Sequence, residues 1–176
     1  NRIIGLKGSA RAGTSETSTL EFLVKNTNGD PVGSGTDVTF KVDSKVGGFK
    51  ITGTDDAGES VTGTTNSDGT ASVTVQSGSV PGVGTIRATV TVDGNSVQGS
   101  GSVSIQGGVA SQARFSMALE TINPAAGNHL GEDVNVEVRV ADRWGNPVDN
   151  TQINFSTELG DIQASCETSS GGCSAT

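Results

Sequence analysis

The chain has 176 residues, of which 32% are hydrophobic and 3% aromatic, and its formal net charge is −8. A single histidine and the lack of tyrosine leave no obvious base for nucleophilic catalysis, which argues against an enzyme. No basic cluster is present to neutralise a phosphate backbone, and no apolar run reaches the length that spans a membrane.

Small and β-branched residues dominate the sequence. Glycine occurs 26 times, and Val and Thr recur at alternate positions between glycine-rich turns, as in Ala88–Val92. Such alternation is typical of strands that are buried on one face, and no long segment has a convincing helical period. The sequence therefore predicts an all-β protein whose thin cores lie between two packed sheets.

The first part of the chain is predicted to contain eight strands separated by Gly, Asn-Gly and Asp-Gly turns. They cover Arg2–Ser9, Ser18–Asn26, Thr36–Val42, Gly48–Thr52, Ser60–Thr65, Thr70–Gln76, Gly84–Val92 and Asn95–Ile105. Asp93-Gly94 predicts a tight hairpin between the last two strands. Eight short strands with these turns match an immunoglobulin-like sandwich.

Gly107-Gly108 is the expected joint between two domains, residues 1–106 and 107–176. The strands predicted after it cover Gln112–Glu120, Asp133–Ala141, Thr151–Ser156, Ile162–Glu167 and Cys173–Thr176. The first domain continues for roughly thirty residues past the point that aligns with Thr176, so the second sandwich is predicted to be C-terminally truncated. Two explanations are open: the chain is a fragment of a longer polypeptide, or strands of another molecule complete the sandwich.

Two segments about 115 residues apart repeat one pattern, and this spacing is the size of a small domain. Val24–Val32 and Val140–Val148 each end an alternating strand and continue through a Gly-Asp/Asn-Pro-Val turn. The turn residues are Gly29 and Pro31 in the first copy and Gly145 and Pro147 in the second. We expect the prolines to occupy equivalent positions, Val32 and Val148 to enter the next strand, and Phe40 and Phe155 to face the core.

The repeat resembles the group 1 bacterial immunoglobulin-like domain (Big-1), which occurs in tandem in invasin- and intimin-like surface proteins. The resemblance is carried by both Gly-Asp/Asn-Pro-Val turns and by Ser67–Ala71, which is similar to the Thr-Asp-x-Gly-x-Ala element of that family. It implies a secreted or surface-exposed rod of such modules and leaves ligand binding to a terminal domain. The sequence departs from the family pattern in the long segment Ser44–Glu59 and in its cysteine pair.

Cys166 and Cys173 are seven positions apart and flank a Gly-Gly turn that could bring two hairpin strands together. The pair predicts a disulfide and an oxidising compartment. A zinc site is disfavoured because it needs four ligands, and the only histidine, His129, is distant in sequence and lies in an expected loop.

Acidic and amide side chains in turns make calcium the one cofactor to consider. The weak candidates are Asp55, Asp56, Glu59, Asp142, Asn146 and Asp149. Against calcium, no Asp-x-Asp-x-Asp-Gly spacing occurs, and Asn or Asp beside Gly is ordinary turn chemistry. Trp144, the single tryptophan, allows three interpretations: packing on a neighbouring domain, an exposed residue without a role, or a platform for ligand stacking.

These features predict a non-catalytic spacer or stalk module of an adhesin, extracellular or on the bacterial cell surface. Its expected partners are neighbouring immunoglobulin-like domains of the same or an adjacent chain, with any host or cell-surface ligand bound by regions outside these residues. One alternative is a subunit of an extracellular filament assembled by strand complementation. Another is a decoration module of a virion or a secreted enzyme, because one fold serves many functions.

Overall fold

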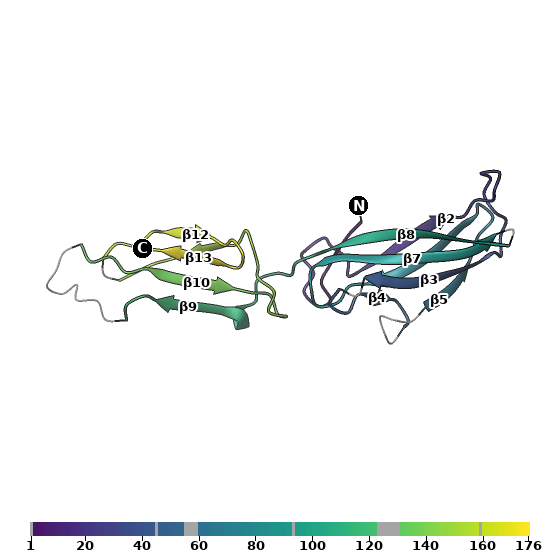
Figure 1. Cartoon of the computed structure of the whole chain (residues 1–176). Coiled ribbons are helices and arrows are strands. Elements are labelled where there is room, and N and C mark those ends of the chain that lie inside the picture. The colour runs from purple at the N-terminus through teal and green to yellow at the C-terminus, as the bar shows by residue number, and fades with distance from the viewer. Residues whose placement is uncertain (1, 45, 55–59, 93, 123–130, 159) are drawn as a thin grey trace. The chain divides into compact units, whose positions relative to one another are not determined.

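The structure, a computed structural model, describes residues 2–44, 46–54, 60–92, 94–122, 131–158 and 160–176. The chain divides into two compact units, Asn1–Gln106 and Gly107–Thr176, each with its own sheets (Figure 1). Within the described residues every regular element is a strand, apart from one short 3-10 helix. The predicted all-β class is therefore confirmed, and the boundary between the units lies immediately before Gly107.

The first unit is built from two sheets, with strand orders β1-β8-β7-β3-β5 and β2-β6-β4. The strands are β1 (Arg2–Gly5), β2 (Thr17–Leu23), β3 (Asp37–Ser44), β4 (Lys50–Ile51), β5 (Ser60–Thr64), β6 (Thr70–Gln76), β7 (Gly82–Val92) and β8 (Asn95–Gln106). All eight predicted strands are present; β6 has the predicted ends, and the ends of the others are shifted. The predicted hairpin is also present, because Val92 pairs with Asn95 across a two-residue loop; Asp93 itself lies outside the described residues.

The core of the first unit contains side chains from both sheets. In β3, Val38, Phe40 and Val42 are buried and the residues between them are exposed, as the two-residue period of a strand requires. In β6, Val73 and Val75 are buried by the same alternation. Phe40 is only 1% exposed, so the predicted register of this strand is correct.

β1 is shorter than predicted, and its pairing is parallel. It ends at Gly5 instead of Ser9 because the backbone then leaves the sheet: the Gly5 amide donates to the Ser15 carbonyl (2.8 Å) and the Lys7 amide to the Gly78 carbonyl (3.1 Å). Leu6, between them, is fully buried. Before this departure β1 pairs in parallel with the end of β8, from Arg2 opposite Val103 to Gly5 opposite Gln106.

The second unit has a three-stranded sheet, β13-β10-β9, and a two-stranded sheet, β11-β12. The strands are β9 (Phe115–Leu119), β10 (Val136–Val140), β11 (Gln152–Asn154), β12 (Ser165–Glu167) and β13 (Gly172–Ala175). The strand predicted from Gln112 begins only at Phe115. A 3-10 helix occupies Gln112–Arg114 because the Arg114 amide donates to the Ser111 carbonyl and closes a tight turn.

Phe155 follows β11 and packs against the small core of the second unit, which contains Val138, Val140 and Val148. It faces inward, as predicted, but it is only partly buried. Phe40 and Phe155 therefore occupy matching positions with different degrees of enclosure.

We predict that Phe40→Ala lowers the free energy of unfolding of the first unit by about 3–5 kcal/mol, the usual result of emptying a buried aromatic site. Phe155→Ala should reduce that of the second unit by less, because its side chain already contacts solvent. Urea unfolding followed by circular dichroism reports both units, and Trp144 fluorescence reports the second. Equal losses from the two substitutions would show that Phe155 is as enclosed as Phe40.

Candidate functional site

Both units form the same turn at the repeated sequence, and we call residues 26–32 and 142–148 the proline turns. In the first, the Asn26 amide donates to the Asp30 carbonyl (2.8 Å) and the Gly29 amide to the Asn26 carbonyl (3.0 Å). The second has the same two bonds at Asp142, Gly145 and Asn146. Gly29 and Gly145 have φ of 87° and 90°, a conformation that favours glycine, which explains the predicted turn glycines.

The first residue of each proline turn also holds the turn through its side chain. Asn26 Oδ1 accepts hydrogen bonds from the amides of Asn28 and Asp30, both 3.0 Å long. Asp142 Oδ1 accepts from the amides of Trp144 and Asn146, both 2.9 Å long. Asn and Asp side chains commonly close turns in this way.

A third copy of this turn links β5 to β6. Asn66 Oδ1 accepts from the amides of Asp68 (3.0 Å) and Thr70 (2.9 Å), and Gly69 follows with φ of 74°. The shared signature is Asn or Asp followed three residues later by Gly. This local signal was visible in the sequence, but the capping role of its first residue was not predicted.

Pro31 and Pro147 occupy equivalent positions, opposite Lys25 and Ala141 respectively. Proline has no amide hydrogen to donate, but neither position needs one. The backbone hydrogen bonds on each side of these two bridges are made by the neighbouring residues. Val32 and Val148 do not enter the next strand as predicted. Their amides donate back to the carbonyls of Val24 (3.0 Å) and Val140 (3.2 Å), and β3 and β11 begin only after a further turn.

Each proline packs against a glycine from a distant turn. A Cβ atom on Gly69 would lie 2.9 Å from Pro31 Cβ, and one on Gly171 would lie 2.7 Å from Pro147 Cβ. The carbonyls of these glycines accept hydrogen bonds from the amides of Val24 (2.9 Å) and Val140 (2.7 Å). A side chain at either glycine would force the two turns apart.

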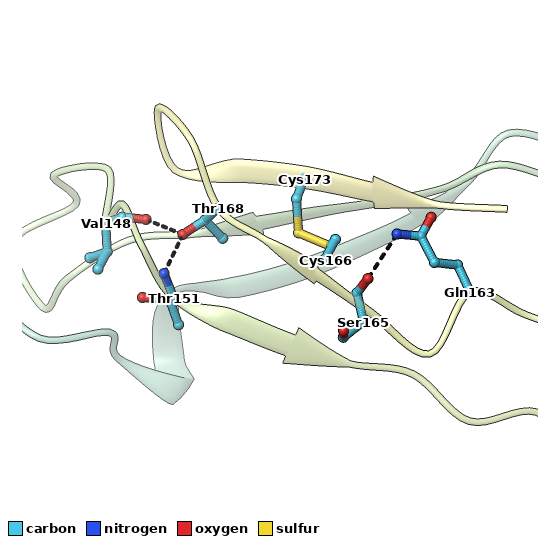
Figure 2. Close-up of a disulfide and its surroundings, with 7 residues drawn as sticks. All are labelled: Val148, Thr151, Gln163, Ser165, Cys166, Thr168 and Cys173. Atoms are coloured by element: carbon cyan, nitrogen blue, oxygen red, sulfur yellow. Dashed lines mark hydrogen bonds between the residues drawn. A yellow bond between two sulfur atoms is a disulfide. The ribbon is translucent and has the colours of Figure 1, made fainter.

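A buried threonine joins the same two chain segments in each unit, a role that no sequence pattern indicated. Thr65, which is 3% exposed, donates through Oγ1 to the Gly33 carbonyl (2.7 Å) and accepts from the Thr36 amide (3.1 Å). Thr168, which is 2% exposed, donates to the Val148 carbonyl (2.8 Å) and accepts from the Thr151 amide (3.0 Å), as Figure 2 shows.

The calcium candidates of the second repeat have structural partners. Asp142 is fully buried, and its second carboxylate oxygen accepts from the Asn146 side-chain amide at 2.9 Å. Asp149 Oδ1 accepts from the Gly171 amide at 3.1 Å. In the part of the chain that the structure describes, no group of three or more His, Cys, Asp or Glu side chains is placed to hold a metal.

The remaining residues considered as functional candidates are the three acidic residues of the first unit, His129 and Trp144. Asp55, Asp56, Glu59 and His129 lie outside the described residues, so calcium binding by the first three stays a prediction. Trp144 is 45% exposed, and the Arg143 guanidinium lies 5.0 Å from its ring centroid, within the range of a cation–π interaction.

Cys166 and Cys173 form a disulfide, as predicted, but the bond joins two sheets (Figure 2). Cys166 lies in β12 opposite Ile153, whereas Cys173 lies in β13 opposite Val138. The sequence had predicted neighbouring strands of one hairpin. The disulfide instead links the two sheets of the second unit, close to the turn that contains Gly171.

Comparisons with family profiles, curated proteins and solved structures found no match to this chain. No helix among the described residues has the length and apolar character needed to cross a membrane.

We predict that Thr65→Val destabilises the first unit by about 1–3 kcal/mol, because a carbonyl and an amide lose their partner at a buried site. Thr64→Val is the matched control; the Thr64 side chain is exposed on the adjacent position of β5, so its loss should change little. Urea unfolding by circular dichroism compares the two. Similar unfolding midpoints would exclude a structural role for the Thr65 hydroxyl.

Reduction of the disulfide should destabilise the second unit by roughly 2–3 kcal/mol, the amount expected from the chain entropy of so short a loop. Intact-mass analysis before and after reduction verifies the bond, and Trp144 fluorescence during urea unfolding measures the effect. The transition of the first unit should not move. Two reactive thiols in the native, unreduced protein would contradict the bond.

Proposed function

We propose that the chain is a tandem pair of group 1 bacterial immunoglobulin-like domains that serves as a non-catalytic spacer in the stalk of a cell-surface or secreted adhesin. The order of strands in the first unit supports this fold. β3, β7 and β8 are neighbours in one sheet, and β2, β6 and β4 in the other. These correspond to the C-F-G and B-E-D groupings of an immunoglobulin sandwich.

The tandem arrangement is supported by contacts that the second unit has in common with the first. In the second unit a proline turn follows the C-terminal end of β10, as one follows β2 in the first unit. Its β10–β13 and β11–β12 pairs correspond to β2–β6 and β3–β5, and a buried threonine follows both β5 and β12. Repetition of this frame is what a rod of similar modules requires.

The disulfide and the acidic charge support the proposed location. Disulfides persist in oxidising compartments, which include the bacterial periplasm and the cell surface. A net charge of −8 keeps such a protein dispersed in solution.

The observation that carries the spacer role is the parallel pairing of β1 with β8. Tension applied to the two ends of the first unit pulls Arg2 and Gln106 in opposite directions along neighbouring strands. All the hydrogen bonds between the strands then resist together. In an antiparallel pair that is pulled from one end, the bonds open one after another.

Force spectroscopy on the full chain tests this role. In one geometry the handles are attached at the N-terminus and at Gly107→Cys, which loads β1 against β8. In the control geometry they are attached at Val83→Cys and Gly107→Cys, which peels β8 from β7, because Val83 pairs with Ser104. Val83 is exposed, so its substitution should leave the fold intact.

The spacer role predicts a clearly higher rupture force for the first geometry, because forced rupture follows the rate of unfolding along the loaded direction. Equal or lower force than in the peeling geometry would contradict the role. Circular dichroism of both cysteine variants before attachment verifies that they are folded.

A further inference from the structure

The first proline turn contains Asn28-Gly29, the only Asn-Gly pair in the sequence. Asparagine belongs to the thermally labile residues, because the backbone nitrogen of the next residue can attack its side-chain amide. Glycine in the next position leaves that nitrogen uncrowded, since it has no side chain. The pair therefore has the composition that most favours spontaneous hydrolysis of an asparagine amide.

The surroundings of Asn28 leave its side chain free to react. The residue is exposed, and its side-chain amide makes no hydrogen bond to the described residues. The space beside the backbone of Gly29 is open as well, since a Cβ atom there would have nothing within 4 Å. A small ring that joins the Asn28 side chain to the Gly29 nitrogen thus has room to form.

The other two turns of this type lack these features. In the second proline turn Trp144 precedes the glycine, and Asn146 is followed by Pro147, whose nitrogen has no hydrogen to lose. In the turn between β5 and β6, Asp68 precedes the glycine, and a Cβ atom on that glycine would lie only 2.9 Å from Pro31 Cβ. Of the three turns, the first proline turn alone combines a reactive amide with open space.

Hydrogen bonds within the first proline turn limit the reaction. The Gly29 amide, whose nitrogen would attack, donates to the Asn26 carbonyl at 3.0 Å. Asn26 Oδ1 accepts from the amides of Asn28 and Asp30, both at 3.0 Å, and so keeps the turn closed. The nitrogen has to leave its acceptor and lose its proton before it can reach the side chain. The rate of reaction therefore depends on how often the turn opens.

We propose that Asn28 is a site of self-modification in the folded protein, hydrolysed through a cyclic imide. The Gly29 nitrogen loses its proton and attacks Asn28 Cγ. A C–N bond forms, the bond from Cγ to the side-chain nitrogen breaks, and ammonia leaves with the proton. Water then opens the ring at the main-chain carbonyl, which gives isoaspartate, or at the side-chain carbonyl, which gives aspartate. One water is consumed, one ammonia is released, and no oxidant or reductant takes part.

Isoaspartate at position 28 changes the turn in two ways. It lengthens the main chain by one carbon, and it replaces a neutral amide with a carboxylate. The longer chain no longer fits the bond that the Asn26 amide donates to the Asp30 carbonyl (2.8 Å). Pro31 is the next residue, so the displacement reaches its close contact with Gly69. The modification thus loosens the first unit and leaves the second unchanged, and it does not depend on the spacer role.

The test incubates the full chain in a mildly alkaline buffer made with oxygen-18 water, followed by peptide mapping in a mass spectrometer. Asn28 should take up one labelled oxygen, and an isoaspartyl methyltransferase should label the product. Asn146 should keep its amide. Asn28→Gln should stay unmodified, because glutamine would have to form a larger ring. A free peptide of residues 24–32 should convert faster than the protein, since nothing holds its turn closed.

Two variants show whether the side chain of Asn26 controls the rate. Asn26→Ala removes the capping oxygen and should raise the rate about fivefold, the factor that corresponds to about 1 kcal/mol of lost hydrogen bonding. Asn26→Asp is the matched control, because it keeps an acceptor oxygen and Asp142 fills this position in the second proline turn. It should convert at the rate of the parent. Circular dichroism verifies that both variants are folded.

Urea unfolding measures the effect of the modification on the fold. The incubated parent should show a lower unfolding midpoint for its first unit, whereas Asn28→Gln incubated for the same time should not. The transition of the second unit, followed by Trp144 fluorescence, should stay in place for both proteins.

Three outcomes overturn the proposal. The first is that Asn28 keeps its amide after the free peptide has converted fully, or that other asparagines convert to the same extent. The second is an equal rate of conversion in the Asn26→Ala and Asn26→Asp variants. The third is an unchanged unfolding midpoint of the first unit in the fully converted protein.

Discussion

Gly69 and Pro31 lie so close together that no side chain fits between them, and the pairing of β2 with β6 depends on this contact. Pro31 follows the end of β2 and Gly69 precedes β6, so the contact fixes where the pairing of Leu23 with Thr70 begins. Alternation forbids a shift of one residue, because the buried face would turn outward, but a shift of two residues keeps similar small side chains buried in a core with so few aromatic residues. The close contact excludes such a shift, and Gly171 with Pro147 does the same in the second unit.

The features that depend on residues close together in the sequence, namely the buried faces of strands and the tight turns, could be predicted. Alternation identified the buried faces, and Asn or Asp followed by Gly identified the turns. Thr65 could not be recognised, because the partners of its hydroxyl are 29 and 32 residues away and the chain contains many exposed threonines with similar neighbours. The parallel pairing of β1 with β8 was also missed, since alternation reveals which face of a strand is buried but not which strand lies beside it.

The disulfide illustrates the same limit. The spacing of Cys166 and Cys173 predicted the bond, whereas its position across two sheets depended on the path of the chain between β12 and β13. The first unit has Gly63 opposite Val38 where the second has Cys166 opposite Ile153. A Cβ on Gly63 would lie 3.2 Å from the Phe40 ring. In the first unit the ring of the fully buried Phe40 thus fills the space beside β5. In the second unit, whose core is less enclosed, the disulfide takes the corresponding position.

The two units differ in where their first strand pairs. β1 joins the sheet that contains β3, whereas β9 pairs with β10 in the other sheet. Within the described residues, β11 pairs only with β12, and a groove lies beside them. Because β1 runs parallel to the last strand of the first unit, tension between the ends of that unit loads all their hydrogen bonds together, whereas β9 runs antiparallel to its neighbour β10.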